Sequence, residues 1–359
     1  MTPCSGDFVG PFVPSDEGVG QEWTRLQAFL ASHGLAFDLR EPPRQFSGGF
    51  GNLNYLIKVD NAPAVLRRPP AGPVPPGAND MRREYSVLRH LWRAYEQAPR
   101  ALHFCDDADV LGAPFLILEY RPGRIIRGEL PEDLGRRPEV GTLLSDMMIE
   151  LLARLHALNP ADVMLSDFGR PQGFLARTLD GWRKRADLVV RGPSSALCSS
   201  IIGYLRDRIV PDQPPALLHG DFKLDNIILE PRTLAPVAVL DWDLATRGDP
   251  LLDLAVLLSY WSDPDDPPAM QQLRQMPTAS GSFRRRSDAL QQYAELTGRS
   301  IDSFVFYRVL AMFRLGIVFL QLYDRYQCGV TTDARFAGFG SLGHALLEFT
   351  HEITRGRAE

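Results

Sequence analysis

The sequence predicts an α+β protein with two lobes, in which a small antiparallel β-sheet precedes a mainly helical part. Two observations carry this prediction. Strand-like runs joined by Gly-rich and Asn-rich turns occupy RQFSGGFGNLNYLIKV and APAVLRR, whereas the pattern after about residue 143 is mostly helical. The length of 359 residues also favours two lobes over a single core. We therefore expect a flexible N-terminal tail over residues 1–20, an N-lobe over 21–121 and a C-lobe over 122–359.

The elements of the first lobe follow from hydrophobic spacing. EWTRLQAFLASHG places its apolar residues on one side and ends in Gly, which predicts a helix over residues 22–34. PPAGPVPPGAND is too rich in Pro and Gly for regular structure, and MRREYSVLRHLWRAY after it is predicted to be a helix. APFLILEY is predicted to be a further strand that ends at RPGR.

The composition excludes several classes of protein. A hydrophobic share of 45% and a charged share of 23% are typical of a soluble globular protein, and a net charge of −5 argues against nucleic acid or an anionic membrane as partner. No long apolar run predicts a membrane span, and the first twenty residues lack the pattern of a secretion signal. The four cysteines lie far apart without a CxxC pair, which indicates a reducing compartment, and we expect a cytoplasmic protein.

The stretch LLHGDFKLDNIIL, Leu217 to Leu229, places five polar side chains between two apolar runs. Buried segments on both sides of a charged loop are a common way to build an active site. Its polar residues are His219, Asp221, Lys223, Asp225 and Asn226. We expect His219 to be structural and to bond backbone near the loop.

A β-hairpin is predicted directly after this loop. Residues 227–229 and 237–240 read as two short strands, separated by the Pro-containing turn EPRTLAP. If residue 227 faces residue 240, Asn226 faces Asp241 at the mouth of the hairpin. An amide oxygen and a carboxylate beside Asp221 are hard oxygen ligands of the kind that Mg²⁺ takes.

HGDFKLDN followed by VLDWD resembles the catalytic loop and metal-binding segment of the aminoglycoside phosphotransferase and choline kinase-like family, which has a protein-kinase-like fold. The resemblance extends over roughly residues 40 to 350 and includes FSGGFGNLNYLI, VLRRPP, REYSVLRHL, LILEYRPG and RGDPLLDLA. Within this family, FRLGIVFLQLYDR is most similar to the phosphotransferase-like domain fused to acyl-CoA dehydrogenases.

The resemblance implies specific roles. Asp221 would orient and deprotonate the acceptor hydroxyl, Asn226 and Asp241 would bind Mg²⁺, and Lys223 would touch the γ-phosphate of ATP or GTP. Phosphoryl transfer depends mainly on alignment and charge neutralisation, which suits this division of roles.

The N-lobe is expected to bind the nucleotide. The glycines of SGGFGN allow the backbone to approach phosphates, and the connector LILEY offers backbone groups to the base. Arg67 stands where most kinases of this fold carry a lysine, and Glu84 is its expected partner. The complete set of nucleotide-binding candidates is Ser47, Gly48, Gly49, Gly51, Asn52, Arg67, Glu84, Glu119 and Tyr120.

Three further acids surround the predicted hairpin and helix. Asp249 and Pro250 are predicted to start a helix as N-cap and first residue. Asp253 lies within an apolar run, and by resemblance it braces the catalytic loop. Asp243 is either a second metal ligand or a loop residue.

The acceptor site is expected on a C-terminal helix. In YRVLAMFRLGIVFLQLYDRY, one thin polar seam runs along an otherwise apolar helix. Its two arginines could meet an anionic acceptor such as a hydroxy acid or hydroxyacyl compound, or they could pair internally with core acids. The seam consists of Tyr307, Arg314, Gln321 and Arg325.

Three functions remain open at this point. The first is a small-molecule kinase whose acceptor is a hydroxy acid or hydroxyacyl compound, an aminoglycoside or an amino alcohol. The second is a nucleotide-binding pseudokinase or scaffold, motivated by Arg67. The third, a metal-dependent phosphoesterase, is less favoured because the seven histidines are scattered. The sequence leaves the acceptor, the choice of ATP or GTP and the oligomeric state open.

Overall fold

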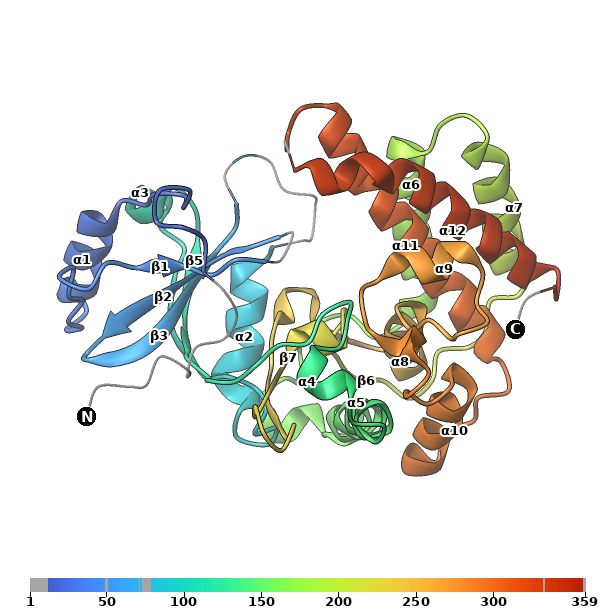
Figure 1. Cartoon of the computed structure of the whole chain (residues 1–359), viewed down its shortest axis with the longest axis horizontal. Coiled ribbons are helices and arrows are strands. Elements are labelled where there is room, and N and C mark those ends of the chain that lie inside the picture. The colour runs from blue at the N-terminus through green and yellow to red at the C-terminus, as the bar shows by residue number, and fades with distance from the viewer. Residues whose placement is uncertain (1–11, 49–50, 71, 73–78, 332, 358–359) are drawn as a thin grey trace. The chain divides into compact units, whose positions relative to one another are not determined.

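The computed structural model describes residues 12–357, apart from residues 49–50, 71, 73–78 and 332. The chain divides into two compact units. The first contains the chain up to Ile125 together with Ala161–Ser166 and Asn226–Ala245. The second contains Ile126–Pro160, Asp167–Asp225 and the chain from Thr246 onward. Figure 1 colours both units by residue number.

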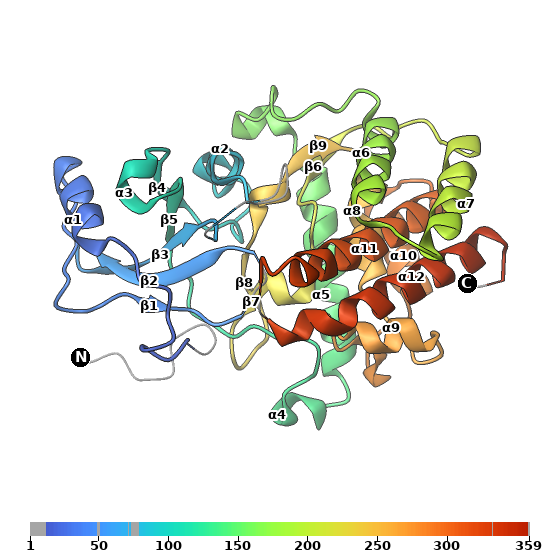
Figure 2. The ribbon, with the colours of Figure 1, turned by 90° about the horizontal axis from the view of Figure 1, so that it is seen from above.

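The first unit is built on a five-stranded sheet with the order β1-β2-β3-β5-β4 and antiparallel pairing throughout. This sheet confirms the predicted one, and Figure 2 shows β1, β2 and β3 as successive strands. The strands are β1 (Arg44–Gln45), β2 (Leu53–Val59), β3 (Ala62–Arg68), β4 (Ala101–Cys105) and β5 (Phe115–Glu119).

Three helices accompany this sheet: α1 (Trp23–Ser32), α2 (Met81–Leu91) and α3 (Ala108–Leu111). Leu26 and Leu30 of α1 are fully buried against Tyr55, Leu66 and Phe115 of the sheet in one apolar core, as the spacing of the first helix predicts. Asp80 caps α2, because its side chain accepts the backbone N–H of Arg83 at 2.9 Å.

Residues 12–20 differ from the flexible tail that the sequence predicts over residues 1–20. The N–H of Val13 donates to the carbonyl of Gln45 at 2.9 Å, and the N–H of Val19 donates to the side chain of Gln45 at 2.7 Å. The hydroxyl of Tyr55 donates to the carbonyl of Val19 at 2.7 Å. These bonds hold the described part of the segment against β1 and β2.

The hairpin β7 (Ile227–Leu229) and β8 (Pro236–Val239) exists as predicted, but its register differs by one residue. Ile227 pairs with Val239, and the N–H of Leu240 donates to the carbonyl of Asn226 at 2.8 Å. Asn226 therefore faces Leu240, and the prediction that it faces Asp241 is wrong. The reason is a shorter turn, because Glu230 already bonds Ala235 across it and β8 begins at Pro236.

The hairpin groups with the first unit, although the sequence placed it in the C-lobe. The N–H of Val239 donates to the carbonyl of Gln97 at 2.7 Å, and Trp242 packs edge-on against Tyr95. Arg124 and Leu229 exchange two backbone hydrogen bonds of 2.8 and 2.9 Å. These contacts explain why the unit extends to Ile125, four residues beyond the predicted lobe boundary.

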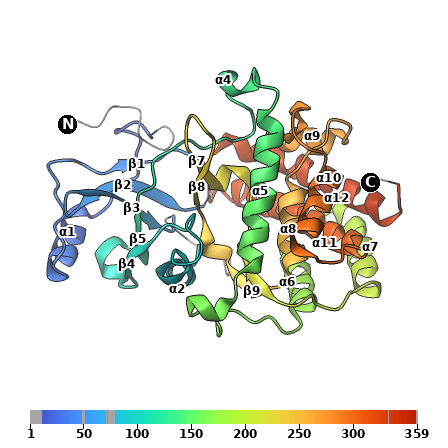
Figure 3. The ribbon, with the colours of Figure 1, turned by 90° about the horizontal axis from the view of Figure 1, so that it is seen from below.

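The second unit is mainly helical, as predicted, and Figure 3 shows its long helix α5 along its full length. Its small sheet pairs β6 (Ala216–Leu218) with β9 (Thr246–Gly248). The helices are α4 (Glu132–Gly135), α5 (Val140–Ala157), α6 (Phe174–Val189), α7 (Ser194–Asp207), α8 (Pro250–Ser259), α9 (Pro268–Leu273), α10 (Arg286–Thr297), α11 (Phe304–Gln327) and α12 (Phe339–Thr354). Its short 3-10 turns include η4 (Thr278–Ser280) and η5 (Ala334–Gly338). The turn η3 (Trp242–Leu244) belongs to the first unit, and η1 (Pro160–Val163) and η2 (Leu224–Asn226) lie where the chain passes from the second unit to the first.

Helices α11 and α12 approach each other closely at two glycines. A Cβ atom on Gly316 of α11 would lie 2.9 Å from the side chain of Leu347, and a Cβ on Gly343 of α12 would lie 2.9 Å from the side chain of Leu320. Both distances are shorter than van der Waals contact. The backbones can therefore pack at this separation only because neither position carries a side chain.

Helix α11 is long and apolar enough, by length and composition alone, to cross a membrane. Of its most apolar window, 67% is buried inside the structure. The core helix of a soluble protein passes the same test, so the observation is weak evidence for a membrane span.

Candidate functional site

Arg67 lies at the centre of a buried polar cluster in the first unit. It is 7% exposed, and its Nε donates to Oε2 of Glu84 at 2.7 Å. Its Nη1 donates to Oδ1 of Asn54 at 3.3 Å, and its Nη2 forms an ion pair with Oδ1 of Asp241. The predicted pair of Arg67 with Glu84 is confirmed. Burial alone would lower the pKa of Arg67, but Asp241 and Glu84 raise it, so the guanidinium stays charged.

Asp241 begins the turn η3 with a left-handed backbone, at φ 71° and ψ 59°. This conformation is uncommon for a residue other than Gly and costs on the order of 1–3 kcal/mol. The side chain of Asp241 is 36% exposed, and Oδ1 is the oxygen that faces Arg67. Strained backbone at a solvent-accessible carboxylate is typical of functional positions.

Asp243 ties three loops of the first unit together. Its Oδ2 accepts the backbone N–H of Asn79 at 3.0 Å and the side-chain amide of Asn52 at 3.4 Å. Asn79 in turn donates from its side chain to Oδ1 of Asn52 at 2.9 Å. Burial, followed by the charge of Asp241, raises the pKa of Asp243 to about 8. Of the two roles open for Asp243, the structure shows the contacts of a loop residue.

The remaining nucleotide-binding candidates lie at strand ends of the same unit. Ser47, Gly48 and Gly51 lie between β1 and β2, and Gly48 has the positive φ of 94° that glycine readily adopts. Gly49 lies outside the described residues. Glu119 ends β5, and its carboxylate accepts the backbone N–H of Arg100 at 3.1 Å and pairs with Arg121 at 3.0 Å. Tyr120 follows and packs against Ile228 and Ala238 of the hairpin.

In the second unit, Asp221 is held by three side chains. Its Oδ1 accepts the hydroxyl of Tyr260 at 2.9 Å and Nη2 of Arg314 at 3.0 Å. Its Oδ2 lies 3.3 Å from Nζ of Lys223, which also pairs with Asp225 at 3.6 Å. Burial alone would raise the pKa of Asp221, but Lys223 and Arg314 outweigh burial and hold the pKa well below its usual range.

Asp253 of α8 braces the loop that carries Asp221 through hydrogen bonds to its backbone. This buried carboxylate accepts the backbone N–H groups of His219 at 2.7 Å and Gly220 at 2.8 Å. His156 lies 3.2 Å away on the same carboxylate, and its other ring nitrogen lies 2.6 Å from the hydroxyl of Tyr293. The predicted bracing role of Asp253 is confirmed. The ring of His219 accepts the N–H of Asp221 at 3.2 Å, which is the structural role predicted for it.

Two residues of the predicted polar seam bond acids of their own unit. Asp249 caps α8 at Leu251, as predicted, and it also accepts the hydroxyl of Tyr307 at 2.8 Å. Arg314 bonds Asp221 as described above. For Arg314 the structure therefore shows internal pairing, one of the two alternatives for the arginines of the seam, and Tyr307 also bonds an acid of its own unit. Gln321 and Arg325, further along α11, are half-buried.

The sequence did not identify Tyr260 as a partner of Asp221. Tyr260 follows the last residue of α8 and is 39 residues away in the chain, so no local spacing connects the two. Trp182 of α6 was also missed, and its ring lies 5.6 Å from the guanidinium carbon of Arg314. Both depend on how α6, α8 and α11 pack, which periodicity does not specify.

The chemistry of Asn226 and Asp241 fits a Mg²⁺ site. Both carry oxygen donors, and they lie at neighbouring positions of the hairpin, since the carbonyl of Asn226 accepts the N–H of Leu240. Within the residues that the structure describes, no three His, Cys, Asp or Glu side chains gather as a metal site. Two protein ligands are enough for Mg²⁺, which usually completes its coordination with water and substrate phosphates.

Comparison with known proteins places these features in context. The phosphotransferase enzyme family matches residues 43–289. Acyl-CoA dehydrogenase family member 10 from Mus musculus is 28% identical over 310 residues, covering 86% of this chain and 29% of that protein. Member 11 from Gallus gallus is 29% identical over 317 residues, covering 87% and 40%. The chain thus spans less than half the length of these relatives.

Solved structures share the fold. A candidate aminoglycoside phosphotransferase from Ralstonia eutropha superposes with a TM-score of 0.74 at 24% identity, covering 94% of this chain and 99% of the other. The aminoglycoside phosphotransferase APH(4)-Ia, in complex with AMP-PNP and hygromycin B, gives 0.59 at 18% identity, covering 92% and 99%. The predicted two-lobed, protein-kinase-like α+β fold is confirmed.

Proposed function

Because the chain belongs to the phosphotransferase enzyme family, we propose that it is a small-molecule kinase that transfers the γ-phosphate of ATP or GTP to a hydroxyl group of a small acceptor. One observation carries the proposal. Asp221 is kept ionised by Arg314 and Lys223, on a loop that a buried carboxylate braces. An ionised, rigidly held carboxylate is what an acceptor hydroxyl needs as its hydrogen-bond partner.

The candidate residues of both units have distinct roles in this proposal. Asp221 orients the acceptor hydroxyl and takes its proton, and Lys223 touches the γ-phosphate. Asn226 and Asp241 hold Mg²⁺, which when bound neutralises phosphate charge. A general base contributes about 10²- to 10⁴-fold to the rate, so Asp221 is expected to be indispensable for efficient transfer.

The nucleotide-binding candidates of the first unit belong to the same proposal. Backbone of the Gly-rich segment from Ser47 to Asn52 approaches the phosphates, and backbone at Glu119 and Tyr120 meets the base. Arg67 contacts phosphate in the place of a lysine. It is supported there by Glu84, which holds its Nε, while Nη2 points to Asp241. An AMP-PNP complex of a protein with this fold supports a nucleotide donor.

For the acceptor we propose an anionic hydroxy acid or hydroxyacyl compound. The relatives named as acyl-CoA dehydrogenase family members support this choice, since their names indicate acyl substrates. Gln321 and Arg325 of the seam are the side chains that we expect to contact it, with Tyr307 and Arg314 already engaged by Asp249 and Asp221. An aminoglycoside or amino alcohol is the alternative, supported by the hygromycin B complex. A cytoplasmic location remains part of the proposal.

The test is a nucleotide-consumption screen across these acceptor classes, with ATP and GTP. Asp221→Asn is expected to abolish transfer while nucleotide still raises the melting temperature. Asp225→Asn is the matched control, because Asp225 lies on the same loop and also pairs with Lys223, and it is expected to retain transfer. Retained transfer by Asp221→Asn would remove Asp221 from the mechanism.

A second candidate function is a nucleotide-binding pseudokinase. The observation that favours it is Arg67, whose guanidinium already pairs with the proposed metal ligand Asp241. Stabilisation by nucleotide without transfer to any acceptor would support this function. Hydrolysis of a phosphomonoester without added nucleotide would instead support a phosphoesterase.

A further inference from the structure

Two donors converge on one oxygen of Asp221. The hydroxyl of Tyr260 and Nη2 of Arg314 both bond Oδ1, at 2.9 and 3.0 Å. Lys223 lies on the other side, 3.3 Å from Oδ2. The two oxygens of this carboxylate are therefore chemically different, because two buried donors hold Oδ1 while a cation on the polar loop itself approaches Oδ2.

Arg314 is fixed from several directions. It is 7% exposed, and the same Nη2 also donates to the carbonyl of Gly220 at 3.2 Å, so it holds both the side chain and the backbone of the loop. Its Nη1 lies 3.4 Å from the hydroxyl of Tyr260. Trp182 lies against the guanidinium, and Gly316 lies two residues further along α11 at the close contact with α12.

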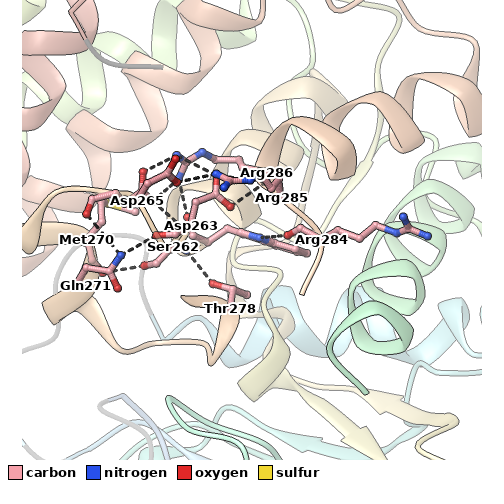
Figure 4. A network of polar contacts seen from close by, with 11 residues as sticks. Ser262, Asp263, Asp265, Met270, Gln271, Thr278, Arg284, Arg285 and Arg286 are labelled. Atoms are coloured by element: carbon pink, nitrogen blue, oxygen red, sulfur yellow. Dashed lines mark hydrogen bonds and ion pairs between the residues drawn. The ribbon is translucent and has the colours of Figure 1, made fainter. Parts of the chain in front are cut away.

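Tyr260 is fixed by the segment that follows it. Trp261 donates from its ring to the carbonyl of Arg284 at 3.0 Å, and Arg286 donates to the carbonyl of Trp261 at 2.7 Å. Figure 4 shows the network around this segment, in which Ser262 donates its backbone N–H to the hydroxyl oxygen of Thr278 at 2.8 Å and its own hydroxyl to the carbonyl of Met270 at 2.7 Å. Arg286 also pairs with Asp266 at 2.7 Å. The tyrosine hydroxyl is thus presented to Asp221 by a rigid turn.

From this geometry we infer that Arg314 and Tyr260 are positioning residues, which fix Oδ1 of Asp221 so that Oδ2 receives the acceptor hydroxyl. The inference rests on the proposed kinase function and assigns Arg314 a role other than acceptor binding. In the transfer step the O–H bond of the acceptor breaks and a bond from its oxygen to the γ-phosphorus forms. The bond between the γ-phosphorus and the bridging oxygen breaks, the nucleoside diphosphate leaves, and the proton passes to Oδ2.

The low basicity of a carboxylate held in this way has a mechanistic consequence. Two donors on Oδ1 and a cation at Oδ2 stabilise the ionised form, so Asp221 remains ready to accept a hydrogen bond in acidic solution. A weak base takes the proton late, which suits the loose transition state of phosphoryl transfer. The main contribution of Asp221 is then alignment, and alignment depends on the residues that hold it.

The experiment compares Arg314→Met, Arg314→Lys and Tyr260→Phe with the wild type. The assay measures ATP consumption as a function of pH, with the acceptor identified in the screen and with water alone. Arg314→Met is expected to lower kcat by about 10²-fold, which is the loss expected for a misplaced catalytic group. Because Asp221 loses a cationic partner, the acid limb of the pH–rate profile is expected to move to higher pH. Tyr260→Phe is expected to show smaller changes of kcat and of the acid limb in the same directions. Arg314→Lys is expected to retain more of the wild-type kcat than Arg314→Met.

Arg308→Met is the matched control, because Arg308 lies on the same helix and its guanidinium lies over the ring of Phe349 of α12. It is expected to leave kcat and the pH profile unchanged. If Arg314→Met fails to fold, Arg314→Lys and Tyr260→Phe still test the inference. The inference would be overturned if the folded Arg314 and Tyr260 variants kept the wild-type kcat and the wild-type acid limb. The proposed function would still stand in that case, provided that Asp221→Asn abolishes transfer. No turnover by the wild type would overturn the proposed function and this inference together.

Discussion

Arg67 of β3 and Glu84 of α2 form a buried ion pair, with 2.7 Å between Nε and Oε2. Glu84 is 1% exposed and also accepts the N–H of Trp242 at 3.3 Å, next to Asp241. One guanidinium therefore compensates two carboxylates, those of Glu84 and Asp241. The cluster therefore has an unequal charge balance, and we expect the loss of the cation to be more costly than the loss of either acid.

This imbalance predicts different stabilities for two variants. Arg67→Met leaves two acids without their cation and is expected to lower the free energy of unfolding by about 3–5 kcal/mol. Glu84→Gln is expected to cost less, because Arg67 keeps its pair with Asp241. Urea denaturation of both variants and of the double variant measures this. Equal losses for the two single variants would contradict the shared-cation arrangement.

Asp253 predicts a pH dependence of stability. Burial alone would raise its pKa, but bonding to His156 and the backbone holds the pKa below its usual range. A carboxylate with a depressed pKa in the folded state stabilises the fold above its unfolded pKa of about 4, and this contribution is lost as the pH falls further. Asp253→Asn is therefore expected to melt below the wild type at pH 7, with the difference narrowing in acid. Parallel melting curves from neutral pH to about pH 3 would contradict the prediction.

Variants of Tyr307 and Arg325 on α11 are expected to distinguish a structural role from a role in acceptor binding. Tyr307→Phe removes one of the bonds to Asp249 and is expected to lower the free energy of unfolding by about 0.5–1.5 kcal/mol without changing the KM for the acceptor. Arg325→Met is expected to raise that KM with little effect on stability. A raised KM for the acceptor in Tyr307→Phe would contradict the structural role and would indicate that Tyr307 contacts the acceptor.

Gly123 and Gly181 differ in the space around them and allow a controlled comparison of two Gly→Ala variants. A Cβ on Gly123 would lie 2.4 Å from the side chain of Ile228 and 2.5 Å from the carbonyl oxygen of Leu229, whereas one on Gly181 of α6 would meet nothing within 4 Å. Gly123→Ala is expected to lower the free energy of unfolding by about 1–3 kcal/mol. Gly181→Ala is expected to raise it by about 0.5–1 kcal/mol, since alanine favours helix. A neutral Gly123→Ala would show that the bridge between Arg124 and Leu229 can relax.

Local patterns in the sequence predicted what local physics determines. Alternating apolar residues specify the sheet of β2, β3 and β5, and Asp249 and Asp253 are recognisable because an acid at a helix start or within an apolar run has few ways to be satisfied. The pairing of Arg67 with Glu84 followed from the family resemblance, and the structure confirms it.

Other features depend on information that spacing does not contain. The hairpin register differs by one residue because Glu230 bonds Ala235 and shortens the turn, a choice among turn types that the motif EPRTLAP leaves open. The binding of Asp221 by Tyr260 and Arg314 depends on the packing of α8 and α11. Residues 12–20 are held by Gln45 and Tyr55, although their composition resembles that of a loose tail.

The glycine contact between α11 and α12 sets the spacing of two helices, one of which carries Arg314. Gly316 lies two residues beyond Arg314, so a methyl group there would act as a wedge between the helix axes and would displace the guanidinium from the loop it holds. Gly316 itself carries neither a charge nor a side chain. If the proposed function holds, added volume at Gly316 would reduce transfer without changing any polar side chain of the loop that carries Asp221.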